Sequence, residues 1–432
     1  MQTHTPPSEE RAGAAVALAA LIFLAALAAA AVLLVQPPRA VPAGAPEGEF
    51  SSGRAMRHVR EIARSPHPTG SAEIERVRGY VMEELRRLGA APEIQAAEVV
   101  KLSRGVGWPA AAGRVQNIVA RLPGTANSRA LMLAAHYDSV PTAPGATDDG
   151  AGVAALLETL RALKTAGPLR NDLIILVTDA EELGLIGAHA FADEHPWMRD
   201  VGVVLNFEGR GAGGPSMMFE TSRGNGALVR ELAGAAPHPV ANSLMYAVYE
   251  RLPNDTDMTV FKRAGAAGLN FAYAERFTHY HTMLDSAEEI DERSLQHHGS
   301  YALSLARRFG GLDLNELKEQ DAVYFNFFGP AFVRYPVSWA LHLTIFISAL
   351  FVFTSWLGRR AGRLSLKGVS AGLVAFLLAS ALAALATAGV WRVARALHEG
   401  RAWLPWGTPY LLWPYEVGFV LLLQIGDLYR RL

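Results

Sequence analysis

Three long runs without a charged side chain constrain this chain more than any other feature of its sequence. They cover residues 14–36, 335–358 and 368–391, and each is long enough to cross a bilayer as a helix, which needs about 20 residues. The first run exceeds the ~7 to 15 apolar residues of a cleaved signal peptide, which favours an uncleaved anchor. The sequence therefore predicts a membrane protein with more than one span.

A fourth apolar segment and one basic loop complete the predicted topology. Residues 403–426 are aromatic and apolar but contain three prolines and Glu416, and we expect a further transmembrane helix there. The loop 358–367 has four basic residues and no acidic one, which places it in the cytoplasm by the positive-inside rule. Residues 1–13 are then cytoplasmic, and the chain between the first two spans lies on the outer side, whether periplasmic, extracellular or lumenal.

Residues 47–315 form the one segment long and polar enough for a water-soluble domain. A 3-4-4-3 apolar spacing that begins at Ile74 predicts a helix with Ser71 as its N-cap, and Ser286 with Glu289 predicts a capping box for a later helix. Five runs rich in apolar and β-branched residues are typical of buried strands: 116–121, 130–135, 173–178, 201–207 and 267–272. We expect an α/β fold, a three-layer sandwich with a mixed, largely parallel central sheet.

Composition excludes several classes of function. The 40 Lys and Arg residues balance 41 Asp and Glu residues, so the chain has no overall positive charge that would attract nucleic acid. Because the chain contains no Cys, a metal centre can use only His and carboxylate ligands. Among the predicted spans only His342 and Glu416 are ionisable, which argues against a transporter.

Four of the predicted strands are followed by His or carboxylate residues. The carboxyl ends of strands in an open α/β sheet meet at one edge, so these side chains are expected to lie together. Taken singly, acidic pairs are common at helix starts, and Asp-Asp-Gly is a common turn. Together they form a donor set for hydrolytic zinc, in which carboxylates would repel without a cation. The predicted metal ligands are His136, Asp148, Glu182, Glu208 and His281.

Residues 50–310 resemble the dinuclear-zinc exopeptidases. That family includes secreted bacterial aminopeptidases and the glutamate carboxypeptidase and transferrin-receptor group. The resemblance rests on four motifs in the family's order: His136-x-Asp138-Ser, Asp148-Asp-Gly-Ala-Gly152, Glu181-Glu182-x-Gly and Tyr280-His281-Thr-x-x-Asp285. Many soluble members have Asp where this chain has Glu208. The membrane-embedded branch, which is similar to endoplasmic reticulum metallopeptidase, has Glu at this position. That branch usually has more spans after the peptidase domain than are expected in this chain.

The resemblance implies a role for each residue. Asp148 would bridge two Zn²⁺ or other divalent ions. His136 and Glu208 would complete one site, and Glu182 and His281 the other. Three further residues would act beside the metals: Glu181 as general base, Asp138 behind His136, and Tyr280 as a hydrogen-bond donor to the oxyanion.

The resulting expectation is a membrane-anchored aminopeptidase whose partners are peptide substrates and membrane lipid, with no nucleic acid. Two alternatives stay open on the same fold. A glutaminyl-cyclase-like acyltransferase would use one zinc ion, and a non-catalytic receptor-like domain would normally have lost ligands. Asp255, Thr256 and Asp257 either line the substrate cleft or simply turn the chain.

Overall fold

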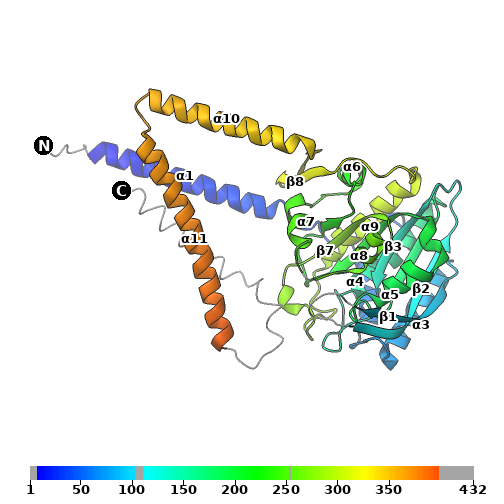
Figure 1. Cartoon of the computed structure of the whole chain (residues 1–432). Coiled ribbons are helices and arrows are strands. Elements are labelled where there is room, and N and C mark those ends of the chain that lie inside the picture. The colour runs from blue at the N-terminus through cyan, green and yellow to red at the C-terminus, as the bar shows by residue number, and fades with distance from the viewer. Residues whose placement is uncertain (1–6, 103–109, 253, 398–432) are drawn as a thin grey trace. The chain divides into compact units, whose positions relative to one another are not determined.

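The computed structural model describes residues 7–102, 110–252 and 254–397, and the chain separates into two compact units (Figure 1). The first unit is Met1–Val337, and the second is Ser338–Leu432. The first contains the α/β domain. The second contains, in its described part, two long helices.

A seven-stranded sheet forms the centre of the first unit, in the order β1-β2-β4-β3-β5-β7-β6. Its strands are β1 (Glu93–Leu102), β2 (Ala110–Leu122), β3 (Ala130–His136), β4 (Leu173–Thr178), β5 (Val201–Gly209), β6 (Met217–Thr221) and β7 (Ala267–Tyr273). The four central strands β4, β3, β5 and β7 are parallel, whereas β1, β2 and β6 are antiparallel to their neighbours. The mixed, largely parallel sheet expected from the sequence is therefore confirmed.

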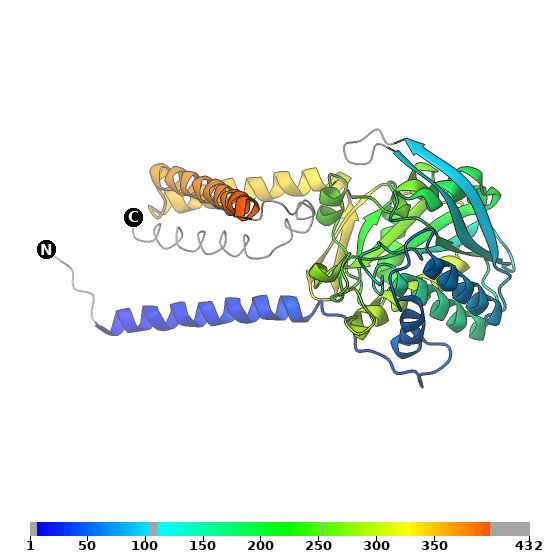
Figure 2. The ribbon, with the colours of Figure 1, turned by 90° about the horizontal axis from the view of Figure 1, so that it is seen from below.

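Helices cover both faces of this sheet (Figure 2). One face is covered by α2 (Ser52–Ile62), α3 (Ala72–Arg87), α4 (Gly150–Leu163), α6 (Gly226–Ala235) and α9 (Glu292–Gly311), and the other by α5 (Ile186–Glu194) and α8 (Asp257–Arg263). Strand β3 explains the arrangement, because Leu131 and Leu133 pack into the first core and Met132 and Ala134 into the second. A strand buried on both faces needs apolar residues on both faces, and β3 has them from Ala130 to Ala135.

The ends of two helices test the capping predictions. Helix α3 begins after Ser71, whose side chain accepts a hydrogen bond from the Ile74 N–H at 3.1 Å, as predicted. The capping box at Ser286 and Glu289 is wrong, because the chain there forms turns and α9 begins only at Glu292. Asp291 caps α9 instead, and its own N–H donates to the carbonyl of Ala212. That tertiary bond sets where the helix begins.

The remaining elements of the first unit are short, apart from its N-terminal helix. They are α1 (Pro7–Leu33), α7 (Ser243–Tyr249), the hairpin β8 (Ala322–Phe328) and β9 (Ala331–Pro336), and the 3₁₀ turns Lys164–Ala166, Pro196–Asp200 and Phe277–His279. The apolar part of α1 within the described residues is Leu18–Leu33, which overlaps the predicted span 14–36.

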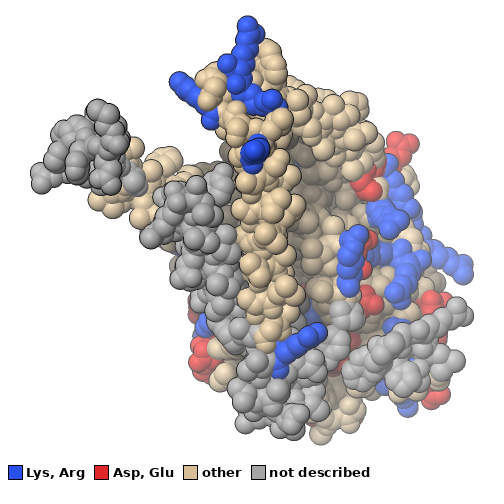
Figure 3. All heavy atoms as spheres, turned by 60° about the vertical axis from the view of Figure 1, so that its left-hand side comes forward, with Lys and Arg blue, Asp and Glu red and all other residues tan. Residues whose placement is uncertain are grey.

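The second unit contains α10 (Ser338–Arg360) and α11 (Leu366–Leu397). By length and composition, Ser338–Arg360 and Leu366–Ala386 are apolar enough to cross a membrane. They overlap the predicted spans 335–358 and 368–391, whereas the predicted span 403–426 lies outside the described residues. Figure 3 shows Lys and Arg gathered at one end of these helices, where the turn contains Arg359, Arg360, Arg363 and Lys367.

Candidate metal centre

The five predicted metal ligands meet at one edge of the sheet. They are His136 at the end of β3, Asp148 in the loop before α4, Glu182 after β4, Glu208 in β5 and His281 after β7. The carboxyl ends of the four parallel strands β3, β4, β5 and β7 and the loops that follow them supply all five. The convergence expected from the sequence is therefore present in the fold.

Asp148 lies between the two histidines. Its Oδ1 is 3.2 Å from Nε2 of His136, and its Oδ2 is 3.1 Å from Nε2 of His281. Glu208 Oε2 lies 3.8 Å from the first histidine nitrogen, and Glu182 Oε1 lies 3.0 Å from the second. In each of the two groups that share Asp148, the ligand atoms lie within 4.8 Å of one another.

Glu181 lies beside both groups. It forms a third cluster with His136 and Glu182, again within 4.8 Å, and its side chain is buried. Burial and the neighbouring carboxylate of Glu208 raise the pKa of Glu181 well above its usual range. A carboxylate with a raised pKa at such a site is suited to accept and return a proton near neutral pH.

Burial and the neighbouring charges shift the pKa values of the donor set away from their usual range. Burial, together with Asp148, raises the pKa of Glu182 to about 7, and it raises the pKa of Glu208 to about 8. Burial opposes ionisation of His281, but Asp148 and Glu182 raise its pKa to about 10. Glu182, Glu208 and His281 therefore compete for protons, although the positive charge of Arg210 lowers the pKa of Glu208 in part. The buried His and carboxylate donors thus fit a divalent metal chemically, since a cation would remove that competition.

Asp138 supports both the first histidine and the acidic loop. Its Oδ1 lies 3.4 Å from Nδ1 of His136, and its carbonyl oxygen lies 3.0 Å from the same nitrogen. Its carboxylate also accepts the N–H groups of Glu181 and Glu182 at 2.9 and 3.1 Å. One buried carboxylate therefore orients a ligand and holds the backbone of the two acids, a second task that the motif did not reveal.

Two further aspartates hold the loop that carries Asp148. Asp285 accepts the N–H and the hydroxyl of Thr147 at 2.8 and 2.5 Å. Asp149 accepts the N–H of His136 at 3.1 Å and caps α4 through Gly152 N–H at 3.0 Å. These buried bonds fix the direction of the Asp148 carboxylate at the sheet edge.

Tyr280 is positioned by a cation that the sequence analysis left without a role. Nη1 of Arg210 donates to the Tyr280 hydroxyl at 3.1 Å, and Nη2 donates to the carbonyl of Asp255 at 3.3 Å. The Tyr280 ring stacks on His281 with centroids 3.7 Å apart, and His281 adopts a left-handed backbone at φ 59°. Arg210 stands two residues after Glu208, so its place beyond a strand end is the signal that could have identified it.

Two residues of the segment 255–257 are buried at the sheet edge, whereas Asp255 is exposed. Thr256 and Asp257 are buried. The hydroxyl of Thr178, at the end of β4, donates a hydrogen bond of 2.5 Å to the carboxylate of Asp257. Burial raises the pKa of Asp257 to about 6. Between the two readings of this segment, the structure favours a wall of the site.

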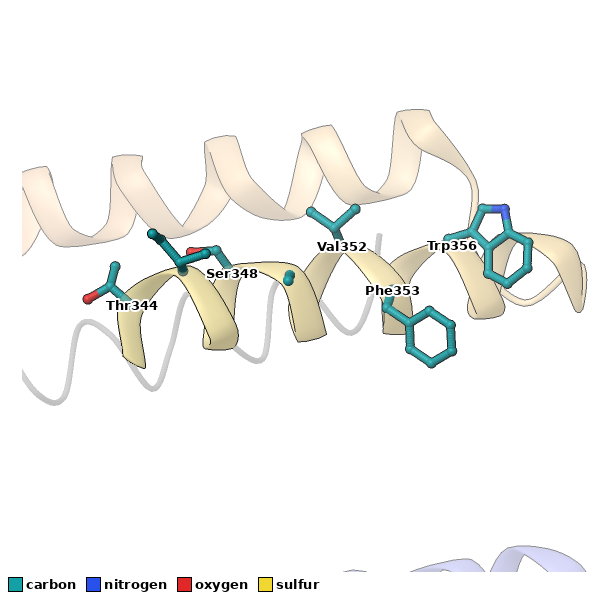
Figure 4. A pocket seen from close by; sticks show the side chains of 7 residues that line it. Thr344, Ser348, Val352, Phe353 and Trp356 are labelled. Atoms are coloured by element: carbon teal, nitrogen blue, oxygen red, sulfur yellow. The ribbon is translucent and has the colours of Figure 1, made fainter. Parts of the chain in front are cut away.

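A hollow of about 650 Å³ in the second unit differs from this site in its chemistry. It lies along α10, and Figure 4 shows Thr344, Ser348, Val352, Phe353 and Trp356 among its lining residues. None of its lining side chains is ionisable. It therefore has no group able to activate water or bind a metal.

Comparisons with known proteins agree with the motifs. Residues 117–306 match the family described as Peptidase family M28. The chain is 33% identical over 300 residues to the vacuolar membrane protease of Candida albicans, which covers 69% of this chain and 34% of that protein. It is 29% identical over 318 residues to endoplasmic reticulum metallopeptidase 1 of Homo sapiens, which covers 68% and 35% of the two chains. The resemblance stated from the motifs is confirmed.

The chain spans about one third of the length of the curated relatives it matches. Among solved structures, it is similar to a zinc aminopeptidase from Bacillus subtilis, with 16% identity and a TM-score of 0.49. That match covers 63% of this chain and 98% of the aminopeptidase. The family match and the protease homologues support the interpretation of this chain as a metallopeptidase.

Proposed function

We propose that this chain, whose residues 117–306 carry a peptidase family M28 domain, is a membrane-anchored zinc aminopeptidase. The observation that carries the proposal is the position of Asp148, each of whose carboxylate oxygens lies about 3 Å from a different histidine. A carboxylate between two separate groups of donors is the arrangement required to bridge a pair of metal ions.

The proposed metal ligands divide into two sets. His136 and Glu208 with Asp148 would hold one Zn²⁺, and Glu182 and His281 with Asp148 the other. When bound, the zinc pair would supply Lewis acidity that activates water and polarises the scissile carbonyl.

Glu181 carries the proton in the proposed reaction. Its carboxylate accepts a proton from the attacking water and later donates it to the amine that leaves when the C–N bond breaks. Its backbone N–H is held by Asp138 at 2.9 Å, which keeps the carboxylate aimed into the site. Its raised pKa lets it hold the proton between the two steps.

Tyr280 stabilises the charge that develops on the carbonyl oxygen. Because the Tyr280 oxygen accepts a hydrogen bond from Arg210, its own O–H is free to donate to the oxyanion. Arg210 acts through Tyr280 as a positioning residue, since its two hydrogen bonds fix the guanidinium beside the ring.

We place the α/β domain on the outer side of the membrane, with α10 and α11 as spans and the loop 358–367 in the cytoplasm. Because the chain has no cysteine, single cysteines report topology cleanly. Ala126→Cys, at an exposed site in the domain, should react with an impermeant thiol reagent in intact cells, and Ser365→Cys should react only after lysis. The reverse pattern would overturn the orientation.

Metal content measured alongside peptide hydrolysis tests the catalytic proposal. The purified chain should hold two zinc ions and cleave a peptide with a free amino terminus, but not the same peptide with an acetylated one. Equal cleavage of both peptides would rule out an aminopeptidase. One ion at full activity would favour the cyclase-like alternative.

A further inference from the structure

Five exposed apolar side chains lie on β8, on α7 and in the turn that follows α7. They are Leu244, Val248, Leu252, Phe327 and Phe328, called here the apolar patch. The two most exposed are Phe327 at 76% and Leu244 at 70%. Several large exposed apolar side chains on adjoining elements are typical of an interaction surface.

Hydrogen bonds join the two elements that form the apolar patch. The Ala241 N–H donates to the side chain of Asn326 at 3.0 Å, and the Ser243 hydroxyl donates to the carbonyl of Tyr324 at 3.2 Å. The start of α7 is therefore fixed to β8, and Figure 1 shows α7 and β8 at the same end of the domain. Leu244 and Val248, four residues apart, share one face of α7.

The hairpin β8–β9 is bounded at both ends by segments that lead into apolar helices. Strand β9 ends at Pro336, and α10 begins two residues later at Ser338. At the other end of the hairpin, a Cβ on Gly329 would lie 2.6 Å from the Cβ of Leu34, which directly follows α1. Six residues of strand separate these two ends, or about 20 Å. Both ends of the hairpin therefore adjoin segments that lead into apolar helices.

A basic groove adjoins the other face of α7. Tyr246 and Glu250 of α7 line this hollow of about 480 Å³ together with four basic residues: Arg223, Lys262, Arg263 and Lys318. Lys262 pairs with Glu220, and Arg263 lies 3.9 Å from Asp255. Within the described residues, Arg223 and Lys318 have no ion pair, so their charge is available to an anionic group. Basic side chains beside an apolar surface are typical of docking on anionic lipid.

We propose that the apolar patch docks on the outer leaflet of the bilayer that α10 enters, with the basic groove against anionic lipid headgroups. The proposal rests on the membrane placement of α10 given above. Phe327 and Phe328 would lie at the headgroup and acyl boundary, where aromatic residues are favoured. Docking would hold α7, and with it the 255–257 wall of the site, close to the membrane surface.

Lipid quenching of single-cysteine variants tests the proposal in the full chain. The variants Val248→Cys and Phe327→Cys, labelled with bimane, are reconstituted in nanodiscs that contain phosphatidylglycerol and headgroup-proximal doxyl lipid. Val100→Cys is the matched control, because Val100 is 74% exposed, apolar and on β1, at the opposite edge of the sheet from β6. We expect about twofold or greater quenching of the two patch labels relative to the control.

A label at Phe351→Cys near the middle of α10, measured in nanodiscs that contain mid-chain doxyl lipid, separates failure of docking from failure of membrane placement. Quenching at Phe351 with patch labels that behave like Val100 would overturn docking alone. No quenching at Phe351 would overturn the placement of α10 and docking with it. If both doxyl lipid and aqueous iodide fail to quench the patch labels, protein covers the patch, either a second copy or residues 398–432. That result would also overturn the proposal. Parental unfolding temperatures verify that each variant is folded.

The charge of the basic groove is tested by the double variant Arg223→Gln, Lys318→Gln. In the parent, patch quenching should be stronger in phosphatidylglycerol than in phosphatidylcholine nanodiscs. The double variant should lose most of that difference. An unchanged difference would overturn the part of the proposal that assigns headgroups to the groove.

Discussion

The α/β domain and helix α10 contain similar apolar side chains but distribute them in opposite ways. All seven residues of β3 are buried, whereas α10 has no buried residue. Each distribution lowers the free energy in a different solvent: water drives apolar side chains inward, and a bilayer accepts them on the outside. The difference teaches that composition alone does not identify a core, because the same residue types form the core of one region and the exposed surface of the other.

Charged groups follow the same contrast. The domain brings carboxylates and histidines together at one edge of its sheet, and most of them are buried. Between Trp339 and Gly358, α10 has no Asp, Glu, Lys or Arg. Chemistry is therefore expected in the domain and anchoring in α10, and the following variants are designed to break or sharpen this separation.

The largest effect is expected at the general base. Glu181→Gln keeps the shape of the side chain but removes its basicity, so kcat should fall by about 10² to 10⁴ while metal content stays at the parental value. Glu182→Gln, the neighbouring control, should instead lose metal affinity. Turnover near the parental rate by a fully metallated Glu181→Gln enzyme would refute the proposed mechanism.

Truncation of a leucine should affect the two regions unequally. Leu133→Ala in β3 removes a fully buried side chain and should lower the free energy of unfolding of the domain by about 2 to 5 kcal/mol. Leu378→Ala in α11, where the side chain is exposed, should change it by less than about 0.5 kcal/mol. Denaturant unfolding of the full chain, followed by circular dichroism, measures both. Equal losses would contradict the assignment of separate surroundings.

A new carboxylate at two equally exposed sites compares the solvents directly. Phe351 is 65% exposed in α10, and Phe351→Asp should disfavour insertion by about 3 kcal/mol because a charge enters the hydrocarbon. Val100→Asp in the domain should alter stability by less than about 0.5 kcal/mol, since that site faces water. Resistance to alkaline extraction reports the first effect, and thermal unfolding reports the second. Full membrane retention of Phe351→Asp would argue against a spanning α10.

The smallest effect is expected from a buried histidine in α9. Burial, with a contribution from His297, lowers the pKa of His298 to about 3, whereas the unfolded value is about 6.5. The neutral form stabilises the fold above pH 6.5, and this stability is lost as the pH falls toward 3. Between pH 7.5 and 5.5 the loss should be about 1 kcal/mol.

His298→Gln tests this loss and retains a polar group near the hydroxyl of Ser216, which lies 2.8 Å from Nδ1 of His298. The variant should unfold with a pH dependence smaller by that amount. Parallel pH profiles of unfolding for the parent and the variant would show that His298 does not titrate as described.

Much of the fold was predictable because it depends on local patterns. The strand β4, the start of α3 at Ser71 and the acids after β4 follow from residue type and spacing within a few positions. The start of α9 was not predictable in this way, because the bond from Asp291 to Ala212 joins residues about 80 positions apart. The local capping signal at Ser286 does not determine the start of the helix, because a buried tertiary hydrogen bond stabilises the fold more than an exposed cap does.

The sequence by itself determined which groups are available: apolar runs for a membrane, strands buried on both faces, and His and carboxylate residues after strands. Only the tertiary structure decided how these groups combine. It placed each oxygen of Asp148 against a different histidine, and it set Arg210 against Tyr280 across 70 residues of chain. The physical reason is that distances between side chains on different strands depend on register and loop packing, which sequence spacing along one strand does not encode.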